Sequence, residues 1–282
     1  MKNFHSNQFM QVTDVTLMVS NIETSLKFYQ EVFGFKLLEK IDNTYKLGTH
    51  TNTHLITLVY NPLSMPKQRT TGLYHFAILL PSRAHLGQFI KHMIETKTPV
   101  TGGADHGISE ALYLDDPDGN GIEIYADKPE NEWPRFDEVV NSPMDYQDLV
   151  NKAVQTPFTK IPDETIMGHI HLHVANMKAA RTFFIDILGF QNTMEYGPQA
   201  AFVSDLGYHH HIGFNIWNGQ NIPNNPDNAV GLKSYTLYVP KDRYNTLLER
   251  IDKAHITLTQ DGDKVYIKDV NNVKVYLTTD FR

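Results

Sequence analysis

The sequence predicts an α+β fold of four βαβββ modules, and three observations lead to this prediction. A strand, a helical stretch and a Gly-Phe pair at residues 14–35 recur in the same order at residues 169–190. A second strand pattern, which begins with Gly-Leu and ends with proline, occurs at residues 72–81 and again at 231–240. Further short strand-like runs follow each helical stretch. A repeat of this kind indicates that one supersecondary unit occurs four times.

All four modules open with a strand of the same phase. One face of each strand is apolar, and we expect a helix to cover it. The opposite face begins with Asp14, His75, His169 and Ser234 in modules 1 to 4, respectively. In modules 1 and 3, serine or asparagine precedes the helical stretch and a glycine follows it. These are the usual signals for the start and the end of a helix.

The chain is long enough for two domains. The spacing between the second and third opening strands is longer than the other two spacings, and the surplus is the proline-containing stretch 129–164. Prolines among charged residues are typical of a connection between packed units. We therefore predict a first two-module domain at 1–128 (modules 1 and 2), a linker at 129–164, and a second two-module domain at 165–282 (modules 3 and 4).

Residues 104–126 contain the clearest local motif. Asp-Pro-Asp-Gly at 116–119 is typical of a turn, and strand-like runs lie on both sides of it. A hairpin centred on this turn places Tyr113 opposite Glu123 on the polar face, with His106 just upstream. A buried carboxylate without a partner is very unfavourable, so we expect Glu123 to have one, and a divalent metal ion is the natural choice.

Composition excludes several classes of function. The formal net charge is −7 and is spread without runs, which argues against nucleic acid and anionic membranes as partners. There are no cysteines, so disulfides, thiolate metal sites and a cysteine nucleophile are excluded. The first 20 residues lack a signal-peptide pattern, and no apolar run reaches the roughly 18 residues of a membrane span. We expect a soluble, cytoplasmic protein.

These motifs together resemble the vicinal oxygen chelate superfamily, which includes glyoxalase I, bleomycin-resistance proteins and extradiol ring-cleaving dioxygenases. Within it the chain is similar to the four-module catechol 2,3-dioxygenase type, on the stretches 71–81, 106–113, 166–174 and 208–217. The resemblance implies two tandem vicinal-oxygen-chelate domains. It also implies a metal-dependent extradiol dioxygenase that cleaves catechol, or a substituted catechol, with O₂.

Ring-cleaving members of this family are expected to hold Fe(II) with two histidines and one glutamate, a ligand set that also accepts Mn(II). Matched residue by residue, the metal ligands are His75, Glu123 and His169. The resemblance therefore implies one working site, between modules 2 and 3. Strand alternation alone does not choose among the histidines at 169, 171 and 173, and only the module alignment selects the first.

Modules 1 and 4 carry Asp14, Ser234 and Lys274 at the positions aligned with these ligands, so we expect them to serve as scaffold. The alternatives to metal binding are structural. Each histidine could be a hydrogen-bonded residue of the core, and Glu123 could be a solubilising residue on an edge strand.

The resemblance also implies catalytic residues that do not bind the metal. The family pattern places an acid–base histidine in the last strand of module 3, where this chain has three consecutive histidines, 209–211. The alignment favours His211, with His210 next. Tyr113 and His106 match a tyrosine and a histidine that are expected to hydrogen-bond the substrate oxygens or dioxygen.

Two other functions compete with ring cleavage. A glyoxalase-like isomerase or lyase would normally require two acidic ligands and two histidine or glutamine ligands for its metal ion. A non-enzymatic drug-binding protein would have no reason to keep His75, Glu123 and His169 together. We therefore expect a small aromatic diol and O₂ as partners, without nucleic acid or membrane, and leave the formation of a homo-oligomer open.

Overall fold

The computed structural model describes residues 3–281, and four modules of the same order follow one another along them. Module 1 contains β1 (Gln11–Val19), α1 (Ile22–Val32), β2 (Lys36–Ile41), β3 (Thr44–Gly48) and β4 (His54–Tyr60). Module 2 contains β5 (Gly72–Leu79), α2 (Arg83–Thr96), β6 (Gly102–Asp105), β7 (Ser109–Asp115) and β8 (Gly121–Asp127).

Modules 3 and 4 repeat this order after the connection at 129–164. Module 3 contains β9 (Ile166–His173), α4 (Met177–Arg181), which continues as the π-helix η3 (Thr182–Ile187), then β10 (Gln191–Tyr196), β11 (Ala200–Ser204) and β12 (Ile212–Asn215). Module 4 contains β13 (Gly231–Tyr238), α5 (Lys241–Lys253), β14 (Thr259–Asp261), β15 (Lys264–Lys268) and β16 (Lys274–Thr278). The connection carries the short 3₁₀-helices η1 (Glu130–Glu132) and η2 (Phe136–Glu138) and the helix α3 (Tyr146–Asn151).

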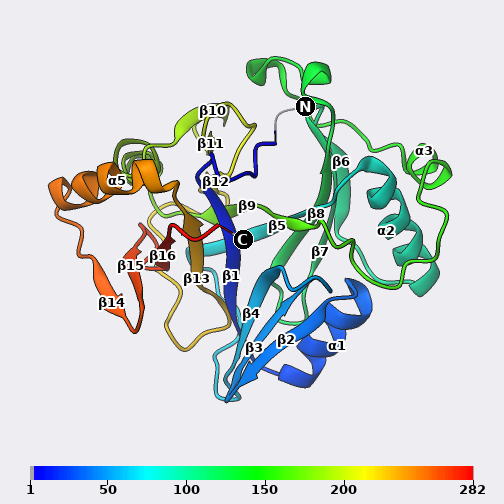
Figure 1. Cartoon of the computed structure of the whole chain (residues 1–282), viewed down its shortest axis with the longest axis horizontal. Coiled ribbons are helices and arrows are strands. Elements are labelled where there is room, and N and C mark those ends of the chain that lie inside the picture. Colours follow the sequence, from blue (N-terminus) through cyan, green and yellow to red (C-terminus); the bar gives the residue numbers. More distant parts are fainter. Residues whose placement is uncertain (1–2, 282) are drawn as a thin grey trace.

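The modules form two eight-stranded sheets (Figure 1). Modules 1 and 4 form one sheet, which we call sheet 1/4, of strand order β14-β15-β16-β13-β1-β4-β3-β2. Modules 2 and 3 form the other, sheet 2/3, of order β10-β11-β12-β9-β5-β8-β7-β6. In each sheet two opening strands pair antiparallel at the centre, and each also pairs in parallel with the last strand of its own module.

This topology confirms the α+β class and the four βαβββ modules. Each sheet takes one module from either side of the connection at 129–164, so the sheets run across the predicted boundary. The division of the chain into domains at 1–128 and 165–282 therefore stays a prediction. Within the part of the chain that the structure describes, no helix is long and apolar enough to cross a bilayer.

The helix signals act as expected. Asn21 and Asn176 accept hydrogen bonds from backbone N–H groups of the first turns of α1 and α4. Gly34 and Gly189 follow these helical segments with φ of 65° and 89°, a conformation that favours glycine. The apolar faces of the opening strands are buried in one core that both sheets share.

Module 1 also holds the hairpin turn of module 2. The hydroxyl of Tyr29, on α1, donates to Oδ2 of Asp116 at 2.9 Å, and both groups are buried. The backbone N–H and the hydroxyl of Ser20 donate to the carboxylate of Asp118. Because β8 begins directly after this turn, sheet 1/4 fixes the start of a strand of sheet 2/3.

Tyr29→Phe should destabilise the protein, because it leaves a buried carboxylate oxygen with one hydrogen bond fewer. We expect the free energy of unfolding to fall by about 1–3 kcal/mol, measured by urea denaturation. Tyr45→Phe, at another core tyrosine, is the control and should cost less. An equal loss in the two variants would mean that the bond to Asp116 contributes nothing specific.

Candidate metal centre

Two histidines and a glutamate converge on one face of sheet 2/3. His75 lies on β5, Glu123 on β8 and His169 on β9. Nε2 of His75 is 3.0 Å, and Nε2 of His169 is 3.3 Å, from Oε2 of Glu123. One donor atom from each residue lies within 4.8 Å of the other two, and among residues 3–281 this is the only such group of His, Cys, Asp or Glu side chains. The sequence-predicted ligand set is thus brought together.

Strand register explains this convergence. Ala77 pairs with Glu123 on β8 and with His169 on β9, so the two side chains flank a fully buried alanine. The register shifts once just before His75 and once at Gly168. Such β-bulges redirect side chains and are common beside functional sites. A Cβ at Gly168 would collide with the hydroxyl of a neighbouring tyrosine, so the bulge before His169 requires glycine.

The electrostatics of Glu123 and His169 favour a carboxylate beside a neutral imidazole. Burial raises the pKa of Glu123, but His169 and His75 lower it more, and the pKa lies well below its ordinary value. Burial lowers the pKa of His169 to about 4, although Glu123 opposes this shift. At neutral pH the site therefore offers a negative charge and an imidazole lone pair, which is the protonation state of metal ligands.

Several donor atoms of this cluster lack a partner. Nε2 of His75 and both ring nitrogens of His169 are buried, and among the described residues none of them makes a hydrogen bond, although Glu123 is close. A buried polar atom without a partner costs about 1–3 kcal/mol. A divalent cation held by the two histidines and Glu123 would satisfy Nε2 of His75 and Nε2 of His169. A set of two histidines and one carboxylate suits Fe(II) or a similar ion. The residues present therefore fit a metal ion.

A cavity of about 420 Å³ opens onto the cluster. This volume lies within the range of small-molecule sites, about 300–1,000 Å³. His75 and Glu123 form part of its wall, and aromatic side chains form much of the remainder: Tyr74, Tyr113, Phe136, Phe202 and Trp217. An aromatic ring of modest size would find both stacking surfaces and polar groups here.

The predicted Tyr113–His106 pair lines the same cavity. Tyr113 on β7 stands opposite Glu123 on β8, as the hairpin predicted. Nε2 of His106 lies 2.7 Å from the hydroxyl oxygen of Tyr113, and its Nδ1 lies 2.6 Å from Oδ1 of Asn141. Since that amide oxygen accepts, Nδ1 of His106 donates and Nε2 accepts from Tyr113. Asn141 belongs to the connection at 129–164, and the sequence did not predict it as a site residue.

Of the two favoured acid–base candidates, His210 faces the cavity and His211 does not. The rings of His210 and His169 lie 4.1 Å apart, centroid to centroid. His211 is fully buried elsewhere: its Nδ1 accepts from the backbone N–H of Asp205, and its Nε2 lies 3.2 Å from the carbonyl oxygen of Phe4. The geometry thus favours His210 over His211, which the family alignment ranks first, and the identity of the acid–base group stays a prediction. The two differ because the chain at 209–211 is irregular, and β12 begins only at residue 212.

The other two histidines of β9, His171 and His173, are both held by Asn215 of β12. The amide nitrogen of Asn215 donates to Nε2 of His171 at 2.9 Å, and its oxygen lies 2.8 Å from Nδ1 of His173. His171 lines the cavity, whereas His173 does not. One asparagine on β12 thus fixes the rings of His171 and His173. Of the three histidines on β9, only His169 lies beside Glu123.

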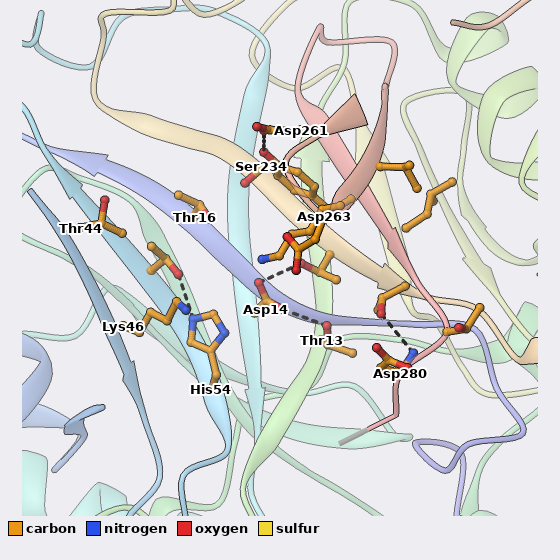
Figure 2. Close-up of a pocket in the computed structure, with 18 of the residues that line it drawn as sticks. Thr13, Asp14, Thr16, Thr44, Lys46, His54, Ser234, Asp261, Asp263 and Asp280 are labelled. Atoms are coloured by element: carbon orange, nitrogen blue, oxygen red, sulfur yellow. Dashed lines mark hydrogen bonds between the residues drawn. The ribbon is translucent and has the colours of Figure 1, made fainter. Parts of the chain in front are cut away.

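Sheet 1/4 has its own cavity, of about 1010 Å³, in the region where modules 1 and 4 meet. Figure 2 shows Asp14 among the residues that line it, with a dashed line to the hydroxyl of Thr13. The carboxylate of Asp14 accepts hydrogen bonds from the hydroxyls of Thr13 and Thr236, at 2.9 Å and 3.0 Å. Ser234 also lines this cavity. At the positions equivalent to His75 and His169, this sheet holds Ser234 and Asp14, neither of which is a histidine.

The residue equivalent to Glu123 in module 4 is Tyr276, which corrects the sequence alignment to Lys274. In sheet 2/3, Ala77 pairs with Glu123, and in sheet 1/4 the corresponding residue, Thr236, pairs with Tyr276.

The turns before β8 and β16 give the same equivalence. Oδ1 of Asp116 accepts from the backbone N–H groups two and four residues ahead, and Oδ1 of Asp269 does the same. Glu123 and Tyr276 stand at equal distances from these aspartates. The alignment to Lys274 matched Val-Lys-Val with Ile-Glu-Ile on their apolar pattern alone and so slipped by one strand repeat.

Comparison with known proteins gives one family. The family model "Glyoxalase/Bleomycin resistance protein/Dioxygenase superfamily" matches residues 11–124. A catechol-2,3-dioxygenase of Bacillus subtilis (strain 168) is 42% identical over 261 residues, which cover 90% of this chain and 91% of that protein. A lactoylglutathione lyase of Escherichia coli O157:H7 is 28% identical over 127 residues, 42% of this chain and 94% of that protein.

The fold also has solved counterparts. The crystal structure of glyoxalase I from Zea mays matches with a TM-score of 0.58 at 16% identity, covering 95% of this chain and 92% of that one. A candidate dioxygenase from Bacillus subtilis subsp. subtilis str. 168 matches with a TM-score of 0.64, also at 16% identity, covering 95% and 84%. At this identity the structural matches show the arrangement of modules and nothing finer.

His75→Ala, Glu123→Gln and His169→Ala should each abolish tight binding of a divalent metal, because each removes one of three donors. Metal content after anaerobic loading with Fe(II) and desalting, measured by mass spectrometry, tests this. Ser234→Ala, at the matching position of module 4, is the control and should retain the wild-type content. Unchanged iron in all three ligand variants would contradict the assignment.

Proposed function

Because the chain belongs to the glyoxalase/bleomycin resistance protein/dioxygenase superfamily, we propose that it is a metal-dependent extradiol dioxygenase that cleaves catechol or a substituted catechol with O₂. The observation that carries the proposal is the group of His75, Glu123 and His169, of which His75 and Glu123 form part of the wall of an aromatic cavity. The relative that supports it, over nine-tenths of the chain, is a catechol-2,3-dioxygenase.

In this proposal His75, Glu123 and His169 hold Fe(II), with Mn(II) as the other ion that the donor set accepts. When bound, the ion supplies a Lewis acid and a redox centre for the diol and O₂. The chain itself supplies binding, orientation and proton transfer. Trp217 and Phe202 flank the space where the aromatic ring would lie.

His210 is the proton-transfer group of the proposal. It lies against His169 and faces the cavity, so it is within reach of a diol hydroxyl at the metal. Cleavage requires removal of a proton from the diol and its return to the opened product, which a histidine near neutral pH can do. Tyr113, whose hydroxyl donates to His106, presents its hydroxyl oxygen to the cavity as an acceptor for a substrate hydroxyl.

Two alternatives have weaker support. A lyase of the glyoxalase type has relatives that match only 42% of this chain, and the described cluster contains one carboxylate rather than two. In a drug-binding protein without metal, the buried ring nitrogens of His75 and His169 would have no metal ion to bind. Residence in the cytoplasm and the lack of nucleic-acid and membrane partners stay predictions from the sequence.

Anaerobically purified protein loaded with Fe(II) should consume one O₂ per catechol cleaved and give a coloured semialdehyde. A colourless diacid would indicate intradiol cleavage instead. Loading with Mn(II) in parallel identifies the active ion. A protein that binds iron but consumes no O₂ with any catechol would contradict the proposal, and the lyase assay with a hemithioacetal would then decide the alternative.

His210→Ala should keep its iron and still bind catechol, yet lower kcat by about 10²–10⁴, the usual loss for a positioned acid–base group. His211→Ala is the matched control from the same histidine run. Because His211 lies outside the cavity, its variant should lose stability but retain turnover per folded, iron-loaded chain. The reverse order of effects, in single-turnover assays, would restore the sequence-based preference.

A further inference from the structure

The proton-transfer residue of the proposal, His210, stands at the end of a hydrogen-bonded chain of buried and half-buried polar groups. Nδ1 of His210 lies 2.8 Å from Nδ1 of His209, and Nε2 of His209 lies 2.9 Å from Oδ1 of Asp127. Oδ2 of Asp127 accepts a hydrogen bond from the hydroxyl of Tyr208 at 3.0 Å. His209 and Tyr208 are fully buried, and the side chain of Asp127 is 25% exposed.

We propose that Asp127 and His209 are positioning residues that fix the tautomer of His210, so that its Nε2 faces the cavity without a proton and acts as a base. The inference rests on the proposed function for the reaction that His210 serves. The tautomer itself is a property of the folded chain and can be measured without turnover.

The hydrogen-bond inventory leads to this tautomer step by step. A carboxylate only accepts, so Nε2 of His209 must carry the proton in its contact with Asp127. A neutral imidazole has one N–H, so Nδ1 of His209 is then an acceptor. It can accept only from Nδ1–H of His210, which leaves Nε2 of His210 unprotonated. In the described part of the chain, Nε2 of His210 has no hydrogen-bond partner of its own.

The surroundings hold this chain of groups rigidly. The ring of Tyr208 packs against that of His209 at a tilt, with ring centroids 3.9 Å apart, and Trp133 from the connection packs against the same imidazole at 5.4 Å. The hydroxyl of Tyr125 lies 2.9 Å from that of Tyr208. Asp127 is the last residue of β8, the strand that carries Glu123. One strand therefore positions both a proposed metal ligand and the group that orients the base.

The arrangement has the logic of a Ser-His-Asp triad, in which a buried carboxylate selects the productive tautomer of a histidine. Without Asp127, His209 would lose the acceptor that directs its proton to Nε2. Its Nδ1 could then donate to His210, and the proton of His210 would move to the nitrogen that faces the cavity. His210 would keep its place in the cavity but present a donor instead of a lone pair.

The direct test is ¹⁵N NMR of the full-length, metal-free protein with labelled histidines, where His210 is assigned by its loss in His210→Gln. The wild type should show a protonated Nδ1 and an unprotonated Nε2. Asp127→Asn should shift the population toward Nε2–H, whereas Asp137→Asn, at an exposed carboxylate paired with Arg135, should change nothing. A protonated Nε2 in the wild type, as an imidazolium at His209 would produce, overturns the proposal.

Kinetics give a second, independent test on iron-loaded protein. Asp127→Asn should lower kcat by about 10–100-fold, as is usual for residues that orient a catalytic group, with unchanged iron content and KM for catechol. In a His210→Ala background the same substitution should cost nothing more, because the group it orients is gone. A full additional loss there would show a merely structural role and contradict the proposal.

A third variant covers the case that Asp127→Asn does not fold. His209→Asn places an amide oxygen near the position of Nδ1 and should preserve the tautomer of His210, whereas His209→Leu should not. Equal ¹⁵N spectra for His210 in these two variants would overturn the proposal. If the wild type consumes no O₂ with any catechol, the proposed function fails, while the NMR result still decides the tautomer.

Discussion

The burial of Glu123 is the constraint on which the site depends. Its carboxylate is 4% exposed and lies between two imidazoles that approach it without forming hydrogen bonds. Rings that form no hydrogen bond to it compensate a buried negative charge poorly, and a protein usually tolerates such a charge only with a cationic partner. A divalent metal ion satisfies the carboxylate and both histidines at once, and the surrounding sheet is built to keep the three donors in place.

The two sheets show how one fold carries a site in one copy and a scaffold in the other. Both pair two opening strands antiparallel at the centre and both enclose a cavity. In sheet 2/3 the facing positions hold two histidines and a glutamate. In sheet 1/4 they hold Asp14, Ser234 and Tyr276, and hydroxyl groups satisfy Asp14. Module 1 supports the site indirectly, because Tyr29 and Ser20 hydrogen-bond the turn before β8, the strand that carries Glu123.

Much of the site could be predicted because it follows from local periodicity. Repeat phase placed His75 and His169 on equivalent strand openings, and the Asp-Pro-Asp-Gly turn placed Tyr113 opposite Glu123. The sequence alignment was least informative near the last strands of modules 3 and 4. His211 turns away from the cavity because the chain is irregular before β12, and Lys274 was chosen over Tyr276 by a slip of one repeat.

Long-range contacts could not be predicted from the sequence for a different reason. The pairing of module 1 with module 4 depends on tertiary packing. So do the contacts of Asn141 with His106 and of Asp127 with His209, which join residues far apart in the sequence. No spacing rule in a single sequence encodes such contacts. Residues that orient a catalytic group are often of this kind, because they act across strands rather than within one.

Anomalous diffraction at the iron edge, on crystals grown anaerobically with Fe(II) and catechol, tests the central claim most directly. The account predicts one strong peak at about 2.0–2.3 Å from Nε2 of His75, Oε2 of Glu123 and Nε2 of His169, with the diol beside it in the aromatic cavity. An iron peak in the cavity of sheet 1/4, or none near Glu123 in protein that binds iron, would contradict it.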